Sequence, residues 1–181
     1  EMSASLVGSE MCIRDSINNY NAYTNGNKLI GVTGEMELPS FDAITEEVSG
    51  AGVLGTYETS TPGNYSSLTQ DVVFRILDED IFSIMNPNEL VDLTLRASAQ
   101  STVKSTGALD YKSMRIVERG RLKSFTPGKL SLGKTMDAKV TLEVLYILIE
   151  VDGETKLEYD KLNSVFVVNG KDLLEKVRAY S

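Results

Sequence analysis

Apolar and polar residues alternate with a period of two through most of the chain between residues 27 and 168. Successive side chains of a β-strand point to opposite faces, so this period predicts strands with one buried face. The pattern is cleanest over residues 90–103, which read LVDLTLRASAQSTV. The predicted strands are residues 29–38, 69–77, 90–103, 110–125, 137–152 and 155–168. A mainly β fold follows, built of antiparallel strands.

Two short helices accompany the predicted strands. Residues 79–86 follow a potential N-cap at Asp78 and end before Pro87, and residues 171–180 carry an apolar stripe. The chain has 181 residues, 41% hydrophobic and 24% charged, which are the values of a globular domain of ordinary size. We therefore expect a single domain over residues 17–181.

The first sixteen residues, EMSASLVGSEMCIRDS, show neither strand alternation nor helical periodicity. They also lack the basic start and the apolar run of a signal peptide. The stretch SLVGSEMCIRDS resembles a peptide that arises when adaptor or vector sequence is translated in assembled reads. We expect residues 1–16 to be a non-native leader, which would leave the native chain without Cys12, its one cysteine. No apolar stretch approaches the roughly 20 residues that cross a bilayer, so we expect no membrane anchor.

The residue types that are missing narrow the possible chemistry. The chain has no histidine, no tryptophan and one cysteine. Without an imidazole there is no Ser-His or Cys-His nucleophile pair and no histidine metal site. One cysteine cannot form an intrachain disulfide. The composition therefore favours a binding or structural protein over an enzyme.

Two local motifs suggest a ligand, and each has a simpler explanation. Gly50, Gly52 and Gly55 spell G-x-G-x-x-G, but the dinucleotide motif needs a helix next, and TYETSTPGN does not form one. The acidic run at residues 78–80 offers oxygen ligands to a hard cation. Acids in the first turn of a helix are more simply explained by the helix dipole. We expect no cofactor and no metal.

The net charge of −8 is unevenly distributed. Residues 35–92 carry twelve acids and one base, whereas residues 93–139 carry ten bases and three acids. Cations recur mostly at every second position of one basic strand: Arg115, Arg119, Arg121 and Lys123. Solvated surface charge, contact between identical copies and phosphate binding all explain such a strand. Nucleic-acid surfaces usually add aromatic rings for base stacking, and none alternates with these cations.

Two features fit poorly with an isolated monomer. The strand 137–152 becomes apolar on both faces at LYILIEV, which includes Leu145, Ile147 and Ile149. Both faces of such a strand are covered, either inside a sandwich or by a neighbouring subunit. Residues 40–68 are acidic and rich in Gly, Ser and Thr, with little regular pattern, as in a functional or disordered loop. A loop that orders against another copy accounts for this segment.

Several short motifs follow one another along the chain. INNYNAYTNGNKLIGVTGEMELPSF is followed by SGAGVLG, by RIVERGRLKSFTPGKL, by a D-G hairpin, and by V-N-G before the terminal helix. Each motif is weak by itself, and their order and spacing are more specific. Over residues 17–181 the chain resembles the major tail tube protein of contractile-tailed temperate phages.

The resemblance implies a small β-sandwich or barrel-like subunit with a helix on its side and no enzymatic activity. Six copies would form a ring whose inner sheets join into a barrel, and rings would stack into a tube within a contractile sheath. This tube would conduct DNA into the host. The implied partners are further copies, the sheath, baseplate or initiator and terminator proteins, and the tape measure protein and DNA in the lumen. Assembly in the host cytoplasm would place the protein in the virion tail tube.

For contacts between copies we expect residues from the basic strand, the glycine-rich loop and the two-faced apolar strand. They are Arg115, Arg119, Arg121, Lys123, Gly50, Gly52, Gly55, Leu145, Ile147 and Ile149. The polar face of strand 90–103 suits a wetted lumen. Two alternatives remain open: a tube subunit of a phage-tail-like bacteriocin or injection system, and a monomeric β-barrel that binds nucleic acid.

Overall fold

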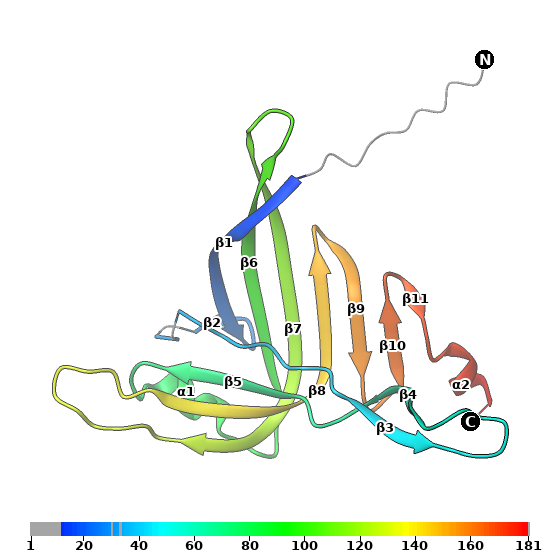
Figure 1. Cartoon of the computed structure of the whole chain (residues 1–181). Helices are drawn as coiled ribbons and strands as arrows, with labels where there is room; N and C mark the ends of the chain where they lie inside the picture. Colours follow the sequence, from blue (N-terminus) through cyan, green and yellow to red (C-terminus); the bar gives the residue numbers. More distant parts are fainter. Residues whose placement is uncertain (1–11, 30, 33, 181) are drawn as a thin grey trace.

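The computed structural model describes residues 12–29, 31–32 and 34–180. Within them the chain forms eleven strands and two short helices (Figure 1). The elements are β1 (Cys12–Thr24), β2 (Asn27–Lys28), β3 (Ala43–Val48), β4 (Tyr57–Tyr65), β5 (Thr69–Phe74), α1 (Glu79–Ile84), β6 (Val91–Val103), β7 (Leu109–Thr126), β8 (Ala138–Val151), β9 (Glu154–Asp160), β10 (Val165–Val168), β11 (Lys171–Asp172) and α2 (Glu175–Tyr180). The predicted β class is confirmed.

Nine strands form one sheet in the order β11-β10-β9-β8-β7-β6-β1-β2, with β5 paired to β8 beside this path. Each of these pairings is antiparallel. Strand β8 is the branch point, because its first half pairs with β5 and its second half with β9. In Figure 1, β5 and the first half of β8 turn across the base of the molecule, while β9 and β10 stand beside the second half.

The strands with one buried face were predicted best. Strands β5, β6, β7 and β8 match the predicted segments to within a few residues. The D-G turn between β8 and β9 is also confirmed, because Asp152 and Gly153 both adopt left-handed backbone conformations, with φ of 52° and 78°. This conformation suits a tight hairpin between twisted strands.

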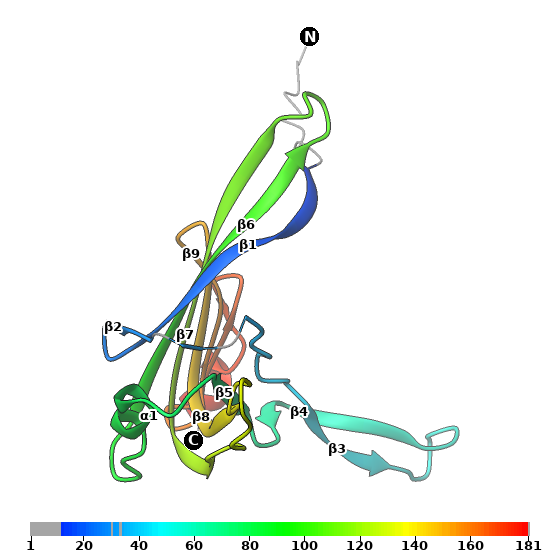
Figure 2. The same ribbon diagram turned by 90° about the vertical axis from the view of Figure 1, so that its left-hand side faces the viewer.

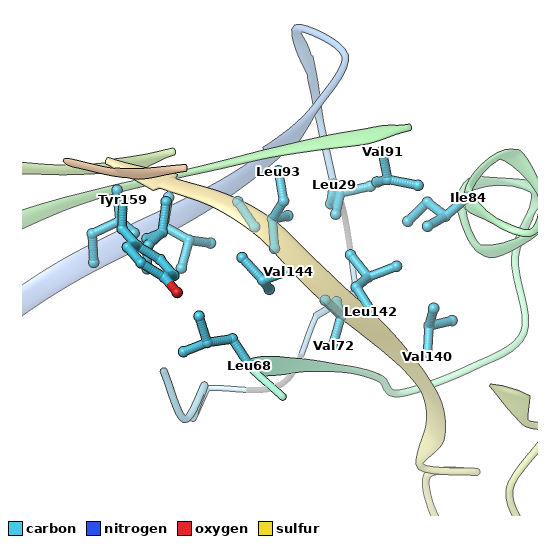
Figure 3. Packing of buried hydrophobic residues seen from close by; sticks show 14 of the residues in the cluster. Leu29, Leu68, Val72, Ile84, Val91, Leu93, Val140, Leu142, Val144 and Tyr159 are labelled. Atoms are coloured by element: carbon cyan, nitrogen blue, oxygen red, sulfur yellow. The ribbon is translucent and has the colours of Figure 1, made fainter. Parts of the chain in front are cut away.

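A row of buried side chains crosses the sheet on its core face. Directly opposed residues of antiparallel strands point to the same face. In register the row contains Thr24, Leu93, Glu118, Ile147, Tyr159 and Phe166, each at most 8% exposed. On this side β5 and α1 contribute to the core, and Figure 3 shows Val72 of β5, Ile84 of α1 and Leu142 of β8 gathered there.

A bulge in β8 reverses which side chains face the core. The register moves from Tyr146 to Val144 opposite consecutive residues of β7, so Leu145 is the extra residue. Before the bulge the buried side chains lie at even positions such as Val144, and after it at odd positions such as Ile147. This reversal explains why the sequence of β8 looks apolar on both faces.

Strand β1 is the long strand that the alternation did not predict. Its pairing with β6 shifts register twice before Asn19, and each shift interrupts the period of two. The strand begins at Cys12, so residues 12–16 of the expected leader pair with β6. Residues 1–11 lie outside the described part of the chain. The non-native origin of this leader stays a prediction.

The strand predicted at residues 29–38 is wrong. In the described part of this stretch one bridge joins Val32 to β5, and residues 34–38 belong to no strand. Gly31 has a φ of 84°, which interrupts an extended strand. Apolar side chains here pack on the core without a ladder of backbone hydrogen bonds. Residues 30 and 33 lie outside the described part.

Two further predictions need correction. The expected loop at residues 40–68 contains a hairpin, β3–β4, whose strands are exposed on both faces and therefore show no alternation. The single strand predicted at residues 155–168 is a second hairpin, β9–β10, whose turn occupies residues 161–164. At residues 40–68 the strands themselves were missed, whereas at residues 155–168 the extended conformation was correct and the turn was missed.

Both predicted helices form, and both are shorter than predicted. Helix α1 begins behind Asp78, whose carboxylate accepts a hydrogen bond from the backbone N–H of Glu79 at 2.7 Å, as the capping pattern predicted. In place of the first turn of the terminal helix, the chain forms the short strand β11. Across the described ranges, no helix has the length and apolar character to cross a membrane.

Gly120 allows β7 and β8 to approach each other at the bulge. A Cβ atom at this position would lie 2.5 Å from the carbonyl oxygen of Glu143. We predict that Gly120→Ala lowers the free energy of unfolding by about 1–3 kcal/mol, because the strands must separate to make room. Urea denaturation measures this change.

Gly34→Ala is the matched control, because nothing lies within 4 Å of its Cβ position. Its free energy of unfolding should stay within about 0.5 kcal/mol of wild type. If Gly120→Ala is as stable as this control, the close approach at the bulge is wrong.

Candidate interaction surfaces

The face of the sheet opposite the core carries charged and polar side chains from neighbouring strands. We call it the polar face. One row across β6, β7, β8 and β9 contains Asp92, Arg119, Tyr146 and Asp160, and a second contains Arg96, Arg115, Glu150 and Thr155. The residues predicted to line a lumen and two of the predicted contact cations therefore occupy one surface.

Ion pairs link the strands across the polar face. Nε of Arg119 lies 3.0 Å from Oδ2 of Asp92, and Nη1 of Arg115 lies 3.0 Å from Oε2 of Glu150. The acids belong to the strands on either side of β7, so each pair crosses one ladder. These pairs are exposed and individually contribute roughly 0–1 kcal/mol. Their larger effect is to offset the positive charge of β7.

Aromatic rings also lie beside the cations of the polar face. Arg119 lies over the ring of Tyr146, 5.1 Å from its centroid, and Arg96 lies over Tyr23 at 5.5 Å. Burial raises the pKa of Tyr146 to about 12, assisted by its hydrogen bond to Glu158. No ring alternates with the cations along β7, and the structure supplies rings from β1 and β8 instead.

The four cations predicted on the basic strand are exposed on β7, but most have partners within the chain. Arg115 and Arg119 pair on the polar face, and Lys123 lies 3.0 Å from Oε2 of Glu143. Within the described residues, Arg121 makes no ion pair. Their role in contacts between copies stays a prediction, and Arg121 has the charge most available for it.

A polar cluster ties the β4–β5 connection to β7 and β8. Ser67 Oγ donates to Oε2 of Glu143 at 2.5 Å, Lys123 Nζ donates to Ser67 at 2.8 Å, and Lys161 Nζ lies 3.5 Å from Oε1 of Glu143. Partial burial opposes ionisation of this carboxyl, but hydrogen bonds from Ser67 and Lys123 and the charges of both lysines lower the pKa of Glu143.

The short distance between Lys123 Nζ and Ser67 Oγ resembles that of a serine nucleophile and its lysine base, but the resemblance ends there. A lysine acts as a base when it is neutral. Here the carboxylate of Glu143 pairs with the ammonium of Lys123 and with that of Lys161. The arrangement therefore supports a structural role for Ser67.

The hairpin β3–β4 is a separate two-stranded sheet that projects from the rest of the molecule (Figure 2). Its tip, residues 49–56, holds the glycines of the G-x-G-x-x-G motif, and Gly52 and Gly55 have φ of 94° and 88°. Strand β4 follows the tip where a dinucleotide site requires a helix. Gly50, the first glycine of the motif, is exposed in the same connection.

The base of this hairpin packs against the rest of the subunit, whereas the side chains of its outer part are exposed. Phe41, Tyr65, Tyr159 and Phe166 pack edge to face with ring centroids 5.3–5.7 Å apart. Tyr159 also donates a hydrogen bond to the carbonyl oxygen of Gly63 at 2.9 Å. Beyond this base the exposed side chains include both apolar and acidic residues: Ile44, Leu54, Tyr57, Glu46, Glu47 and Glu58.

The three apolar residues predicted for contacts between copies lie in different environments. Ile147 is 1% exposed and belongs to the core, so the structure removes it from the surface set. Ile149 is partly buried against the same core. Leu145, the bulge residue, is half-buried on the other side, beside Arg119 and Tyr146. Leu145 and Ile149 therefore both keep some exposed surface, and that of Leu145 lies on the polar face.

The acidic run at residues 78–80 serves as a helix start. Asp78 is the N-cap of α1, and Glu79 and Asp80 lie in its first turn. No group of three or more Cys, Asp or Glu side chains within the described ranges is arranged to hold a metal ion. The cap formed by Asp78 supports the helix-start explanation of this run.

The sequence contained one signal for β1, the strand that supplies Tyr23 to the polar face. Asn25-Gly26 is a strong hairpin dipeptide, and both residues have left-handed backbone conformations, with φ of 48° and 85°. It indicates a strand before residue 25, and therefore the position of Tyr23 on β1. The acids that pair with β7 had no such signal, because their positions depend on the register between strands.

Comparison with known proteins assigns the chain to a family. The family model described as phage tail tube protein FII matches residues 14–180. The tail tube protein of Escherichia phage P2 is 24% identical over 159 residues, which cover 87% of this chain and 91% of that protein. The major tail tube protein of Serratia phage KSP20 is 24% identical over 164 residues, covering 90% and 92% respectively.

The cluster around Glu143 provides a test of the site geometry. A carboxyl whose pKa is lowered by folding stabilises the fold above its unfolded pKa, and this contribution is lost as the pH falls. We predict that Glu143→Gln lowers the free energy of unfolding at pH 7 by about 0.5–1 kcal/mol, after allowance for solvent screening.

The same comparison at about pH 3 should show a smaller difference, because the unfolded wild-type chain then binds a proton at this carboxyl and the advantage of the lowered pKa in the fold is being lost. Urea denaturation at both pH values measures it, with the exposed Glu46→Gln as the control. An equal loss at both pH values would argue against the ionised cluster.

Proposed function

The chain belongs to the phage tail tube protein FII family, and we propose that it is the repeating subunit of a phage tail tube. Hexameric rings of the subunit stack into this tube, which lies inside a contractile sheath and conducts DNA into the host. The observation that carries the proposal is the family match over residues 14–180, nearly the whole chain. The role is structural, and the ion-paired state of Lys123 supports a function without catalysis.

The projecting hairpin β3–β4 is the proposed arm between copies. A two-stranded hairpin alone is marginally stable in water. This one is fixed at its base by aromatic packing, while apolar side chains such as Ile44 and Leu54 remain exposed along it. A neighbouring subunit would cover these side chains, and the glycines at the tip allow the turn to adapt.

The polar face is the proposed lining of the lumen. Its cations, Arg96, Arg115 and Arg119, lie among the acids of neighbouring strands, and two of them form ion pairs. A wall with unpaired cations would bind the phosphates of passing DNA. Paired charges keep the wall hydrated while reducing that attraction, which suits a conduit.

Contacts between copies then depend on cations away from the centre of the polar face. Arg121 is the first candidate, because it is exposed and makes no ion pair within the described residues. The exposed acids Glu46, Glu47 and Glu58 of the hairpin arm are its proposed partners on an adjacent copy. Charge complementarity of this kind sets which surfaces meet.

The other proposed partners are the sheath, the baseplate or initiator protein, the terminator protein and, in the lumen, the tape measure protein and DNA. The subunit assembles in the bacterial cytoplasm and becomes part of the virion. A bacteriocin or injection-system tube would use the same contacts with a different cargo. The pairing of Arg115 and Arg119 with acids disfavours the other alternative, a monomeric β-barrel that binds nucleic acid.

Electron microscopy of the purified protein tests the proposal. We expect hollow tubes or six-fold rings in negative stain, and little binding of labelled oligonucleotides in a mobility shift assay. Arg121→Glu should reduce tube formation, because it places a like charge against the hairpin arm. Arg121→Lys keeps the charge and is the matched control.

A further variant, Arg121→Glu combined with Glu47→Arg, should restore part of the assembly if these positions meet. A wild-type protein that remains monomeric and binds oligonucleotides would contradict the tube proposal. Normal tubes from Arg121→Glu would contradict only the assignment of Arg121 to the contact.

Hydrogen exchange provides a separate test of the hairpin arm. We predict that backbone amides of β3 and β4 exchange fast in the free subunit and slowly in the tube, because docking covers an otherwise marginal ladder. Amides of β7, which is paired on both sides, should exchange slowly in both states and serve as the control. Equal protection of β3 and β4 in both states would show that the hairpin does not dock.

A further inference from the structure

Glu118 lies inside the core of the subunit. It occupies the buried row of the sheet, between Leu93 of β6 and Ile147 of β8, which oppose it in register. The residue is 1% exposed, and its two neighbours are also 1% exposed. Among the described residues, Glu118 is the only buried residue with an ionisable acidic or basic side chain of the Asp, Glu, Lys or Arg type.

The carboxyl group of Glu118 has no partner. Neither of its oxygen atoms accepts or donates a hydrogen bond, and none of the ion pairs in the described ranges includes it. The adjacent residue Arg119 points to the opposite face, where it pairs with Asp92. An isolated ionised carboxylate in such a place is very costly, and the usual outcome is that the group is neutral.

The groups that face Glu118 from the surrounding elements carry no charge. The opposed side chains of β6 and β8 are apolar, and the row continues to Thr24 on β1 and Tyr159 on β9. The hydroxyl of Tyr159 donates to the carbonyl oxygen of Gly63, and the side-chain amide of Gln70 on β5 donates to the carbonyl oxygens of residues 37 and 71. Tyr65 of β4 also packs on this core.

We propose that Glu118 is a proton-binding site of the folded subunit, protonated while the chain is folded and ionised once the chain unfolds. Folding then takes up a proton at this residue, and the stability of the subunit falls as the solution becomes less acidic. The site is a property of the subunit itself and does not depend on tube formation.

The direction of this effect follows from the two states of the carboxyl. Burial raises the pKa of Glu118 from 4.5 to about 8. Between these values the folded state keeps the proton and the unfolded state releases it, so unfolding becomes more favourable as the pH rises. Above a pH of about 8 both states are ionised and the dependence ends.

The composition of the chain makes this signal unusually easy to assign. There is no histidine, the side chain that ordinarily titrates between pH 5 and 8. The other carboxyls with a resolved shift have lowered pKa values, and the shifted tyrosines have raised ones. Among the described side chains, Glu118 is therefore expected to contribute most of the pH-dependent stability within this interval.

Urea denaturation at several pH values tests the proposal with wild type, Glu118→Gln and the exposed control Glu46→Gln. For wild type we expect the unfolding equilibrium constant to rise up to tenfold per pH unit, in total on the order of a thousandfold, between pH 5 and 8. The control should follow wild type, and Glu118→Gln should change less than about tenfold. A Gln variant with the wild-type pH dependence would overturn the proposal.

A second measurement uses the unaltered protein, so it does not depend on the folding of any variant. Nuclear magnetic resonance of wild type with carbon-13-labelled glutamate follows each carboxyl through its titration. The Glu118 resonance is assigned in wild type, by through-bond correlation from its carboxyl carbon to its own backbone amide. A midpoint near pH 8 is expected, and a midpoint near the ordinary value of about 4.3 would overturn the proposal.

Discussion

The bulge at Leu145 is the constraint on which both faces of the sheet depend. Because side chains alternate along a strand, a shift of one residue exchanges the faces of all that follows. With the bulge, the even positions of the first half of β8 and the odd positions of its second half both reach the core. One strand can therefore pair with β5 over its first half and with β9 over its second.

Successive residues of β7 show how sharply this arrangement separates environments. Arg119 lies among acids and an aromatic ring on the polar face, whereas Glu118 lies among apolar side chains with no partner. The charge of Arg119 is offset by an exposed ion pair with a small net free energy. Glu118 avoids the large free energy of burying a charge by holding a proton. The sheet has a polar face and a core face, and β7 supplies residues to both.

The sequence was most informative where a strand has one buried face and a regular ladder, as in β6 and β7. It was least informative at β1, whose register shifts interrupt the alternation, and at β3–β4, where no face is buried and no alternation arises. The basic residues of β7 were correctly identified, but not their partners, because Asp92 and Glu150 meet them only through the register of neighbouring strands. The alternation along β7 places Glu118 on the same face as Ile116. Only the paired sheet shows that the carboxyl group has no hydrogen-bond partner there.

The order of pairing along the chain has a consequence for synthesis on the ribosome. Strands β1 and β5, near the N-terminus, find their main partners in β6 and β8, which are made much later. Until then the described residues up to Phe74 contain the local ladders of β1–β2 and β3–β4 and the bridge from Val32 to Phe74. Non-local pairing is slow, and unpaired strand edges are prone to aggregation. The nascent chain therefore passes through a long interval in which its early strands need protection, and it closes its core only when β8 emerges.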